Sequence, residues 1–216
     1  MTTPAIRAGR LLPAGLILLS LVPVLAGAVR VGQLAGHAPV PDNARFVASP
    51  GPIVVHVVAV TVYSLLGAFQ FSARFRSRHW TWHRRAGRVL VAAGLLTGLS
   101  GLWMTAWYPD APTDGTLVRA IRSVVGTAVT VSIVVAVAAI RRRDIPAHRA
   151  WMIRAYALSL GAGTQVFTQL PWVVVTHSPP YGYPRALLML AGWVINWLVA
   201  EWAIHRADNP RVALGR

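Results

Sequence analysis

The sequence contains no cysteine, no lysine and only six acidic residues among 216. Without cysteine, the chain cannot form a disulfide, a thiolate metal site or a lipid-modified cysteine. The scarce carboxylates offer no pair for acid–base catalysis. Motifs of phosphate-binding loops, dinucleotide-binding folds, zinc proteases and serine hydrolases are also missing. The sequence therefore presents no recognisable catalytic motif, and whether the protein is an enzyme stays open.

Charged residues of both signs together make up only 12% of the sequence, whereas 55% of the residues are hydrophobic. A water-soluble domain needs more polar residues to cover its surface. Apolar runs of about 20 residues recur, and a helix of that length crosses the roughly 30 Å hydrocarbon core. The sequence predicts an all-α, polytopic transmembrane helix bundle, with about six spans in a single membrane domain. The predicted spans cover residues 11–29, 53–71, 87–107, 118–140, 151–175 and 186–204.

Two of these segments have special features. Residues 1–29 combine a basic start, an apolar core and the small residues of Ala26-Gly27-Ala28. This pattern suits either an anchor helix that is retained or a cleaved signal peptide. In the fifth segment we expect Pro171 to bend or loosen the helix, because proline removes a backbone donor.

All 21 basic residues are arginine, and the formal net charge is +15. A nucleic-acid-binding protein gathers such charge on one soluble face, but here it falls between apolar spans. With a cytoplasmic amino terminus, sixteen arginines lie inside and five outside. The positive-inside rule then predicts that both termini are cytoplasmic. Because guanidinium binds phosphate through two parallel hydrogen bonds, we expect membrane lipids, and an anionic headgroup or small molecule, as partners; the sequence specifies no oligomeric state.

Four histidines suggest a cofactor. His83 and His148 each begin a helix at the inner side, where the helix dipole and neighbouring arginines disfavour imidazolium. A neutral imidazole is what haem iron requires. His56 and His177 lie at similar depth near the outer side, so the chain offers an inner and an outer pair. The hypothesis is haem b with these four ligands. However, 29 residues separate His148 from His177, about 44 Å of helix, so at least one of the two lies at the interface.

The second span has a polar face. His56, Tyr63 and Gln70 are seven residues apart and therefore lie on one side of a helix. Polar residues of a membrane helix normally face the bundle interior. These three either bond to neighbouring helices for packing or line a ligand site.

Further polar residues join this candidate site. Gln165 and Asn196 fall near the bilayer midplane, where we expect a hydrogen bond between them. The inner helix starts and their arginines form a candidate anion site. The predicted substrate-binding residues are Tyr63, Gln70, Arg88, Arg154, Gln165 and Asn196. Glu201, the one carboxylate within a span, either extends to the cytoplasm or pairs with an inner arginine such as Arg154 or Arg88.

Three motifs occur in order along the chain. They are His56 with Gly67-Ala68-Phe69-Gln70-Phe71, then His83-Arg84-Arg85-Ala86-Gly87-Arg88, then Asp144-Ile145-Pro146-Ala147-His148-Arg149-Ala150-Trp151-Met152-Ile153-Arg154. Over about residues 53–175 the chain resembles a bacterial membrane-protein family known as domain of unknown function 2306. The resemblance implies a multi-helix inner-membrane protein without an assigned activity.

Three functions are compatible with these residues. The first is a redox protein with b-type haem, which predicts a Soret band. The second is a transporter or binding protein for an anionic or lipid-like molecule, which predicts a midplane cavity lined by Tyr63, Gln165 and Asn196. Substitution of Arg88 or Arg154 would then weaken binding. The third is a non-catalytic assembly partner.

Overall fold

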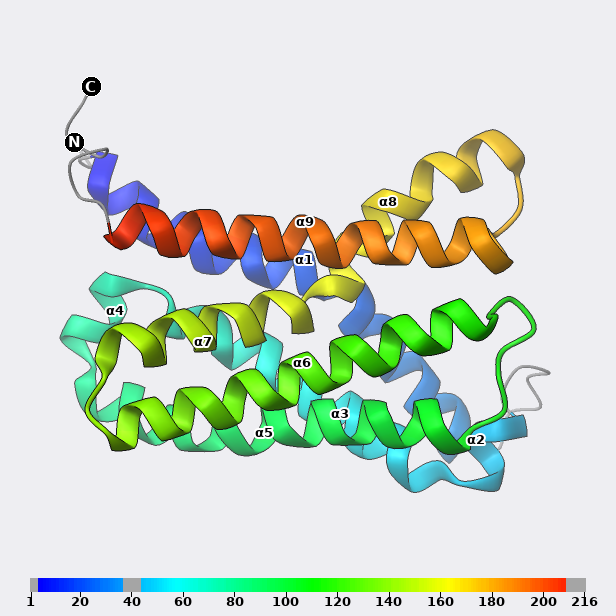
Figure 1. Cartoon of the computed structure of the whole chain (residues 1–216), viewed down its shortest axis with the longest axis horizontal. Helices are drawn as coiled ribbons and strands as arrows, with labels where there is room; N and C mark the ends of the chain where they lie inside the picture. The colour runs from blue at the N-terminus through cyan, green and yellow to red at the C-terminus, as the bar shows by residue number, and fades with distance from the viewer. Residues whose placement is uncertain (1–3, 37–43, 209–216) are drawn as a thin grey trace. The chain divides into compact units, whose positions relative to one another are not determined.

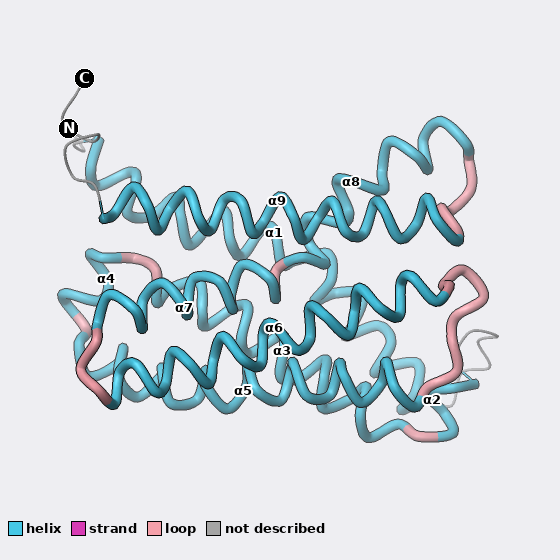
Figure 2. Tube along the Cα trace, viewed as in Figure 1, coloured by secondary structure: helices cyan, strands magenta, loops and turns pink. Residues whose placement is uncertain are grey.

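The structure is a computed structural model that describes residues 4–36 and 44–208. Throughout these residues the secondary structure is helical, with short connecting loops and no strand (Figures 1 and 2). In chain order the helices are α1 (Pro4–Ala35), α2 (Ala44–Ala48), α3 (Pro50–Gln70), α4 (Ala73–Arg78), α5 (Trp80–Trp107), α6 (Thr116–Arg141), α7 (Ile145–Ser159), α8 (Gly161–Thr176) and α9 (Gly182–Asp208). The predicted all-α membrane bundle is confirmed.

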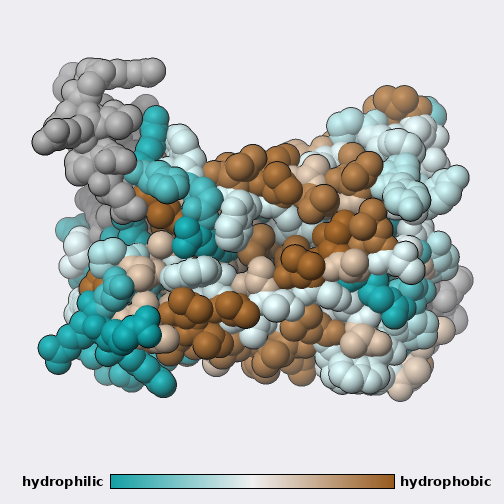
Figure 3. Space-filling view, in the orientation of Figure 1, coloured by the Kyte–Doolittle hydropathy of each residue, from teal (hydrophilic) through white to brown (hydrophobic). Residues whose placement is uncertain are grey.

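Five of the described helices, α1, α3, α5, α6 and α9, are long and apolar enough to cross a membrane. They coincide with five of the six predicted spans. On the face seen in Figure 3, apolar side chains cover the middle of the helices and hydrophilic ones gather toward their ends. Exposed leucine, valine and tryptophan side chains are numerous on these helices. Such a surface suits contact with lipid rather than water.

The chain divides into two compact units, and the first is Met1–Pro112. Its centre is the hairpin of α3 and α5, and α1 packs along α3. A Cβ added at Gly27 of α1 would lie 2.9 Å from Val57 Cγ1, so this glycine permits a close approach of the two helices. Tyr63 and Leu90 are almost fully buried in this unit. The short helix α4 connects α3 to α5 at the end predicted to face the cytoplasm.

The second unit is Thr113–Arg216. Here α6 and α7 form a hairpin, and α9 packs against α6, α7 and α8. The turn between α6 and α7 contains Arg143 with a φ of 63°. Asp144 then caps α7, because its Oδ1 accepts a hydrogen bond from the Ala147 N–H at 3.0 Å. Val118, Ala186 and Met189 form a buried cluster between α6 and α9.

The fifth predicted span is two helices rather than one, since α7 ends at Ser159 and α8 begins at Gly161. Figure 1 shows the chain changing direction at this point. A Cβ at Gly161 would lie 2.1 Å from Trp193 Nε1, so only glycine leaves room for the indole of α9. Helix α8 continues through Pro171, so the predicted bending or loosening at this proline stays a prediction. The interruption of the fifth span lies at Gly161, where α8 packs against Trp193.

Candidate functional site

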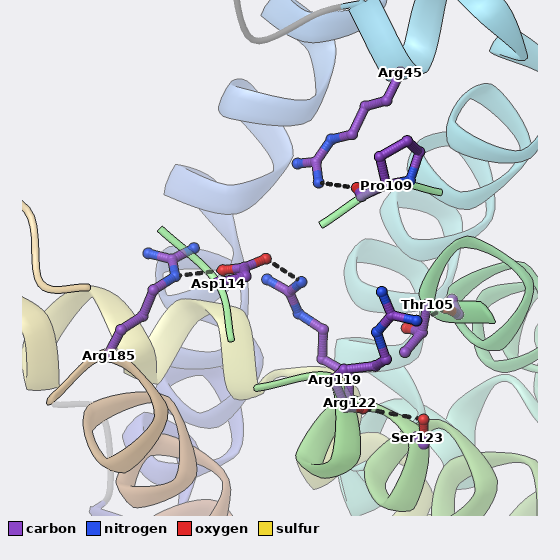
Figure 4. Close-up of polar contacts among 9 residues, drawn as sticks. Arg45, Thr105, Pro109, Asp114, Arg119, Arg122, Ser123 and Arg185 are labelled. Carbon is purple, nitrogen blue, oxygen red and sulfur yellow. Dashed lines mark hydrogen bonds and ion pairs between the residues drawn. The ribbon is translucent and has the colours of Figure 1, made fainter. Parts of the chain in front are cut away.

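The arginines predicted to face outside are engaged within the protein. Asp114, in the loop between α5 and α6, accepts a hydrogen bond from Arg122 Nη1 and another from Arg185 Nε, each at 2.6 Å (Figure 4). Its side chain is only 1% exposed. Burial raises the pKa of Asp114, but the two arginines outweigh it and hold this pKa below its ordinary value. One carboxylate therefore compensates two cations.

The remaining outer arginines are engaged in other ways. The guanidinium carbon atoms of Arg30 and Arg45 lie 5.2 and 4.6 Å from the centre of the Phe46 ring. Arg45 also donates a hydrogen bond to the Pro109 carbonyl at 3.1 Å (Figure 4), and Arg119 makes an intramolecular interaction too. All five outer arginines are thus held by contacts within the chain.

Most of the described arginines at the helix ends predicted to face the cytoplasm have no such partner within that part of the chain. Within residues 44–208, the side chains of eight exposed arginines of α4, α5 and the α6–α7 region form no hydrogen bond or ion pair with the described chain. These are Arg78, Arg84, Arg85, Arg88, Arg141, Arg142, Arg143 and Arg149. Their charge is available to a partner outside the polypeptide.

In the first unit these arginines lie on α4 and α5, which also carry most of an aromatic cluster, defined as Phe69, Phe75, His79 and Trp82. The Phe75 ring centre lies 4.8 Å from that of Trp82, edge to face, and 4.8 Å from that of His79. Phe69 lies 5.7 Å from Phe75, again between ring centres. The cluster joins the end of α3 to α4 and the start of α5. Of its members, Trp82 is of a type enriched at the membrane–water interface.

Short polar contacts fix α4 beside this cluster. Ser72 caps α4 by accepting a hydrogen bond from the Phe75 N–H at 3.3 Å. Arg76 Nη1 donates to the Gln70 carbonyl at 3.2 Å. Gln70, which the sequence predicts as a binding residue, ends α3. Both its side-chain amide atoms, Oε1 and Nε2, are buried and have no hydrogen-bond partner within the part of the chain that the structure describes.

Two of the four predicted haem ligands have a defined ring orientation. His56 Nδ1 lies 3.1 Å from the Thr97 carbonyl and 3.0 Å from Ser100 Oγ, both on α5. His148 Nδ1 lies 2.9 Å from the Ala136 carbonyl on α6. A carbonyl oxygen can only accept, so in each ring Nδ1 carries the proton and Nε2 is left as the acceptor.

The other two histidines lie at helix ends. His83 stacks on Trp80 at the start of α5, with ring centres 5.5 Å apart. His177 is exposed, with a φ of 52°, at the end of α8. His56 and His83 belong to the first unit, and His148 and His177 to the second. Each predicted pair therefore takes one histidine from each unit, and the pairing stays a prediction. Among the described residues no three His, Asp or Glu side chains are grouped as a metal site.

The predicted hydrogen bond between Gln165 and Asn196 is wrong. Asn196 Oδ1 instead accepts from Thr164 Oγ1 at 2.6 Å, and Asn196 Nδ2 donates to the Ala157 carbonyl at 2.9 Å. Gln165 Nε2 donates to the Met189 carbonyl at 3.2 Å. Thr164 and Gln165 are consecutive residues of α8 and so face different directions, and it is Thr164 that meets Asn196. These bonds tie α7 and α8 to α9.

Glu201 is paired with Arg154, one of the two partners that the sequence suggests. Arg154 Nε and Nη2 donate to the two carboxylate oxygens at 2.6 and 2.8 Å. The same guanidinium lies 4.7 Å from the Trp151 ring centre. Because Glu201 already compensates Arg154, an external anion gains less there than at Arg88, which is exposed. Of the two arginines predicted to bind an anion, Arg88 is therefore the better placed.

The comparisons with known proteins agree with this description of a helical membrane protein. Searches of curated proteins and of solved structures found no match. A family model described as a predicted membrane protein (DUF2306) matches residues 53–204, which run from α3 into α9. The match covers more than half of the chain and extends past the three sequence motifs to include the last long helix. The chain therefore belongs to the family of predicted membrane proteins known as domain of unknown function 2306.

Proposed function

We propose that this multi-pass membrane protein binds an anionic, lipid-like molecule at the α4 end of its first unit. The observation that carries the proposal is the contrast between its arginines. Those predicted to face outside are held by Asp114, Phe46 and other internal partners. By contrast Arg78, Arg84, Arg85 and Arg88 are exposed on α4 and α5, the two helices whose rings Phe75 and Trp82 pack together in the aromatic cluster.

The chemistry of this region suits a phosphate group attached to an apolar chain. Each arginine near an anionic membrane surface contributes about 1 kcal/mol of attraction. The first turn of α5 contributes unsatisfied N–H groups and a partial positive charge. Next to these polar groups, the aromatic cluster and the apolar surface of α3 and α5 suit acyl chains. A lipid matches both the cationic part of the site and its aromatic and apolar part, whereas a soluble phosphate matches only the cationic part.

Lipid titration of the purified protein tests this function. In a neutral detergent, native mass spectrometry would count bound short-chain phosphatidylglycerol and phosphatidylcholine. We expect the anionic lipid to bind at least tenfold more tightly. Glycerol phosphate without acyl chains should bind at least tenfold more weakly than the lipid. Equal affinity for glycerol phosphate would assign the site to a soluble phosphorylated molecule instead.

A matched pair of charge variants locates the site. Replacing Arg84, Arg85 and Arg88 together by Gln should weaken phosphatidylglycerol binding about 100-fold, since three contacts of about 1 kcal/mol are lost. The control replaces the three arginines of the α6–α7 turn, 141–143, by Gln and removes the same charge. It should change the affinity less than threefold. Equal losses in the two variants would show a diffuse charge effect and contradict the proposed site.

Binding of b-type haem is a second candidate, supported by one specific observation. Histidines that ligate metals usually donate their other ring N–H to a carbonyl or carboxylate. His56 and His148 have this arrangement, through Thr97 and Ala136. An absorbance spectrum of protein produced with added haem tests the idea. A Soret band that is lost in His56→Ala would support it, and the lack of any band would exclude it.

A further inference from the structure

The amide of Gln70 is the polar group that the described structure leaves least satisfied. Gln70 is the last residue of α3, and both its Oε1 and Nε2 are buried without a hydrogen-bond partner among the described residues. Its backbone carbonyl, by contrast, accepts a hydrogen bond from Arg76. Buried polar side chains are nearly always hydrogen-bonded in native proteins, so this exception calls for a partner from outside the chain.

Two other buried side-chain amides among the described residues, those of Gln165 and Asn196, have hydrogen-bond partners within the chain. The Gln165 amide, on a side chain of the same type, donates to the Met189 carbonyl. Asn196 uses both ends of its amide, toward Thr164 and Ala157. The fold can therefore supply partners for a buried amide where it needs only packing. At the position of Gln70 a methionine or leucine would fill a similar volume without an unsatisfied polar group.

The amide also restricts the chemistry of its partner. It presents one acceptor oxygen and one donor NH2 group. A phosphate with no protonated oxygen only accepts, so it satisfies Nε2 and leaves Oε1 without a donor. A hydroxyl group both donates and accepts, and one or two hydroxyls satisfy both amide atoms. Arg76, whose Nη1 is 3.2 Å from the main-chain carbonyl oxygen of Gln70, places a cation for phosphate next to this residue.

We infer that the molecule bound at the α4 end is a phosphate ester of a polyol, with free hydroxyl groups that Gln70 recognises. This inference rests on the proposed function and specifies its ligand class. In this arrangement the arginines of α4 and α5 bind the phosphate. Gln70 binds the hydroxylated part of the headgroup, and the aromatic cluster lies beside both.

A comparison of two lipids with the same acyl chains tests the inference. Phosphatidylglycerol carries a glycerol headgroup with free hydroxyls, whereas phosphatidic acid has none and has a charge at least as negative. We expect the wild-type protein to prefer phosphatidylglycerol about tenfold, the worth of a hydrogen bond to a buried group. In Gln70→Met the ratio of the two affinities should fall to about one. Without lipid, Gln70→Met should be at least as stable to heat as the wild type.

The matched control is Gln165→Met, which replaces a buried glutamine that has an internal partner. It should lower thermal stability and keep the preference for phosphatidylglycerol. Equal affinity of the wild type for the two lipids would overturn the inference and leave the proposed function standing. If neither lipid binds better than phosphatidylcholine, the proposed function itself fails. A Gln70→Met protein that is less stable and loses both lipids equally would show an internal role for the amide, which also overturns the inference.

Discussion

Asp114 links the α5–α6 loop to two helices, because its single carboxylate contacts Arg122 of α6 and Arg185 of α9. The pKa of Asp114 in the folded protein lies below its ordinary value of 3.8. The unfolded chain therefore takes up this proton first as the pH falls. The stabilisation is complete above about pH 4 and is lost as the pH falls toward the folded pKa. Thermal unfolding between pH 6 and pH 2.5 should show this decline.

The variant Asp114→Asn tests the same contact at neutral pH. It leaves two partly buried arginines without a counter-ion, so we expect a loss of about 2 kcal/mol in unfolding free energy. Its stability should also depend less on pH below 4 than that of the wild type. A parallel decline in both proteins would mean that another carboxylate controls acid unfolding. Asp144→Asn, at the exposed start of α7, is a control for the loss of one aspartate.

The close contact between Gly161 and Trp193 leads to a second prediction. Gly161→Ala places a methyl group 2.1 Å from the rigid indole of Trp193, so we expect a loss of about 1–3 kcal/mol from overpacking. Gly87→Ala is the control, since nothing lies within 4 Å of its added Cβ. Within α5 the control should keep or slightly raise the melting temperature. A Gly161→Ala protein as stable as the control would show that α8 and α9 are not in close contact.

At the scale of the element, the break between α7 and α8 depends on Asn196. Its amide donates to Ala157 near the end of α7 and accepts from Thr164 in the first turn of α8. Asn196→Leu would leave both groups without this partner inside a membrane protein. We expect a loss of about 2 kcal/mol, measured by thermal unfolding in detergent. Hydrogen exchange should quicken at residues 157–164.

A neighbouring substitution on α9 provides the control for Asn196. Val199→Leu changes a side chain that is 57% exposed and faces away from the packed core. It should leave both the melting temperature and the exchange at residues 157–164 unchanged. If Asn196→Leu behaves in the same way, the two bonds to Ala157 and Thr164 do not stabilise the break.

These two helices also show what sequence patterns can predict of an element. Continuous hydrophobicity predicts that residues 151–175 lie in a membrane, but it gives no information about a break. Proline is the usual local signal for a bend, and here Pro171 lies inside a continuous helix. At the break, Gly161 packs so closely against the indole of Trp193, 32 residues away in the sequence, that only glycine fits. Such a contact depends on how α8 and α9 pack, and no local pattern specifies it.

For the molecule as a whole, composition and hydrophobic length suffice to predict a helical membrane protein, and the three motifs identify its family. The hydrogen bonds and ion pairs of the candidate site are harder to predict from the sequence. The pairing of Glu201 with Arg154 follows from the need to compensate a charge in a span. By contrast, two features are visible only once the neighbours of each group are placed. They are the Gln70 amide, which has no hydrogen-bond partner among the described residues, and the double pairing of Asp114.

The number of membrane crossings decides where the carboxyl terminus lies, and it depends on α7 and α8. With 15 and 16 residues, neither helix alone matches the roughly 20 residues of a span. Together they supply enough length for one crossing, because a broken helix is tolerated where polar groups such as Asn196 satisfy its backbone. Six crossings then place both termini on the same side. If α7 and α8 do not cross, five crossings place the termini on opposite sides.

Single cysteines can distinguish these arrangements, because the natural chain has none. We expect a membrane-impermeant maleimide to label Ser178→Cys in intact spheroplasts. Ser77→Cys and His205→Cys should react only after permeabilisation. All three side chains are exposed in the structure, so a lack of reaction reports the side of the membrane rather than burial. The reverse pattern at positions 178 and 205, with position 77 still protected, would show that α7 and α8 stay on the inner side. In that case the positive-inside rule would fail for the second unit, while Arg84, Arg85 and Arg88 would still face the cytoplasm.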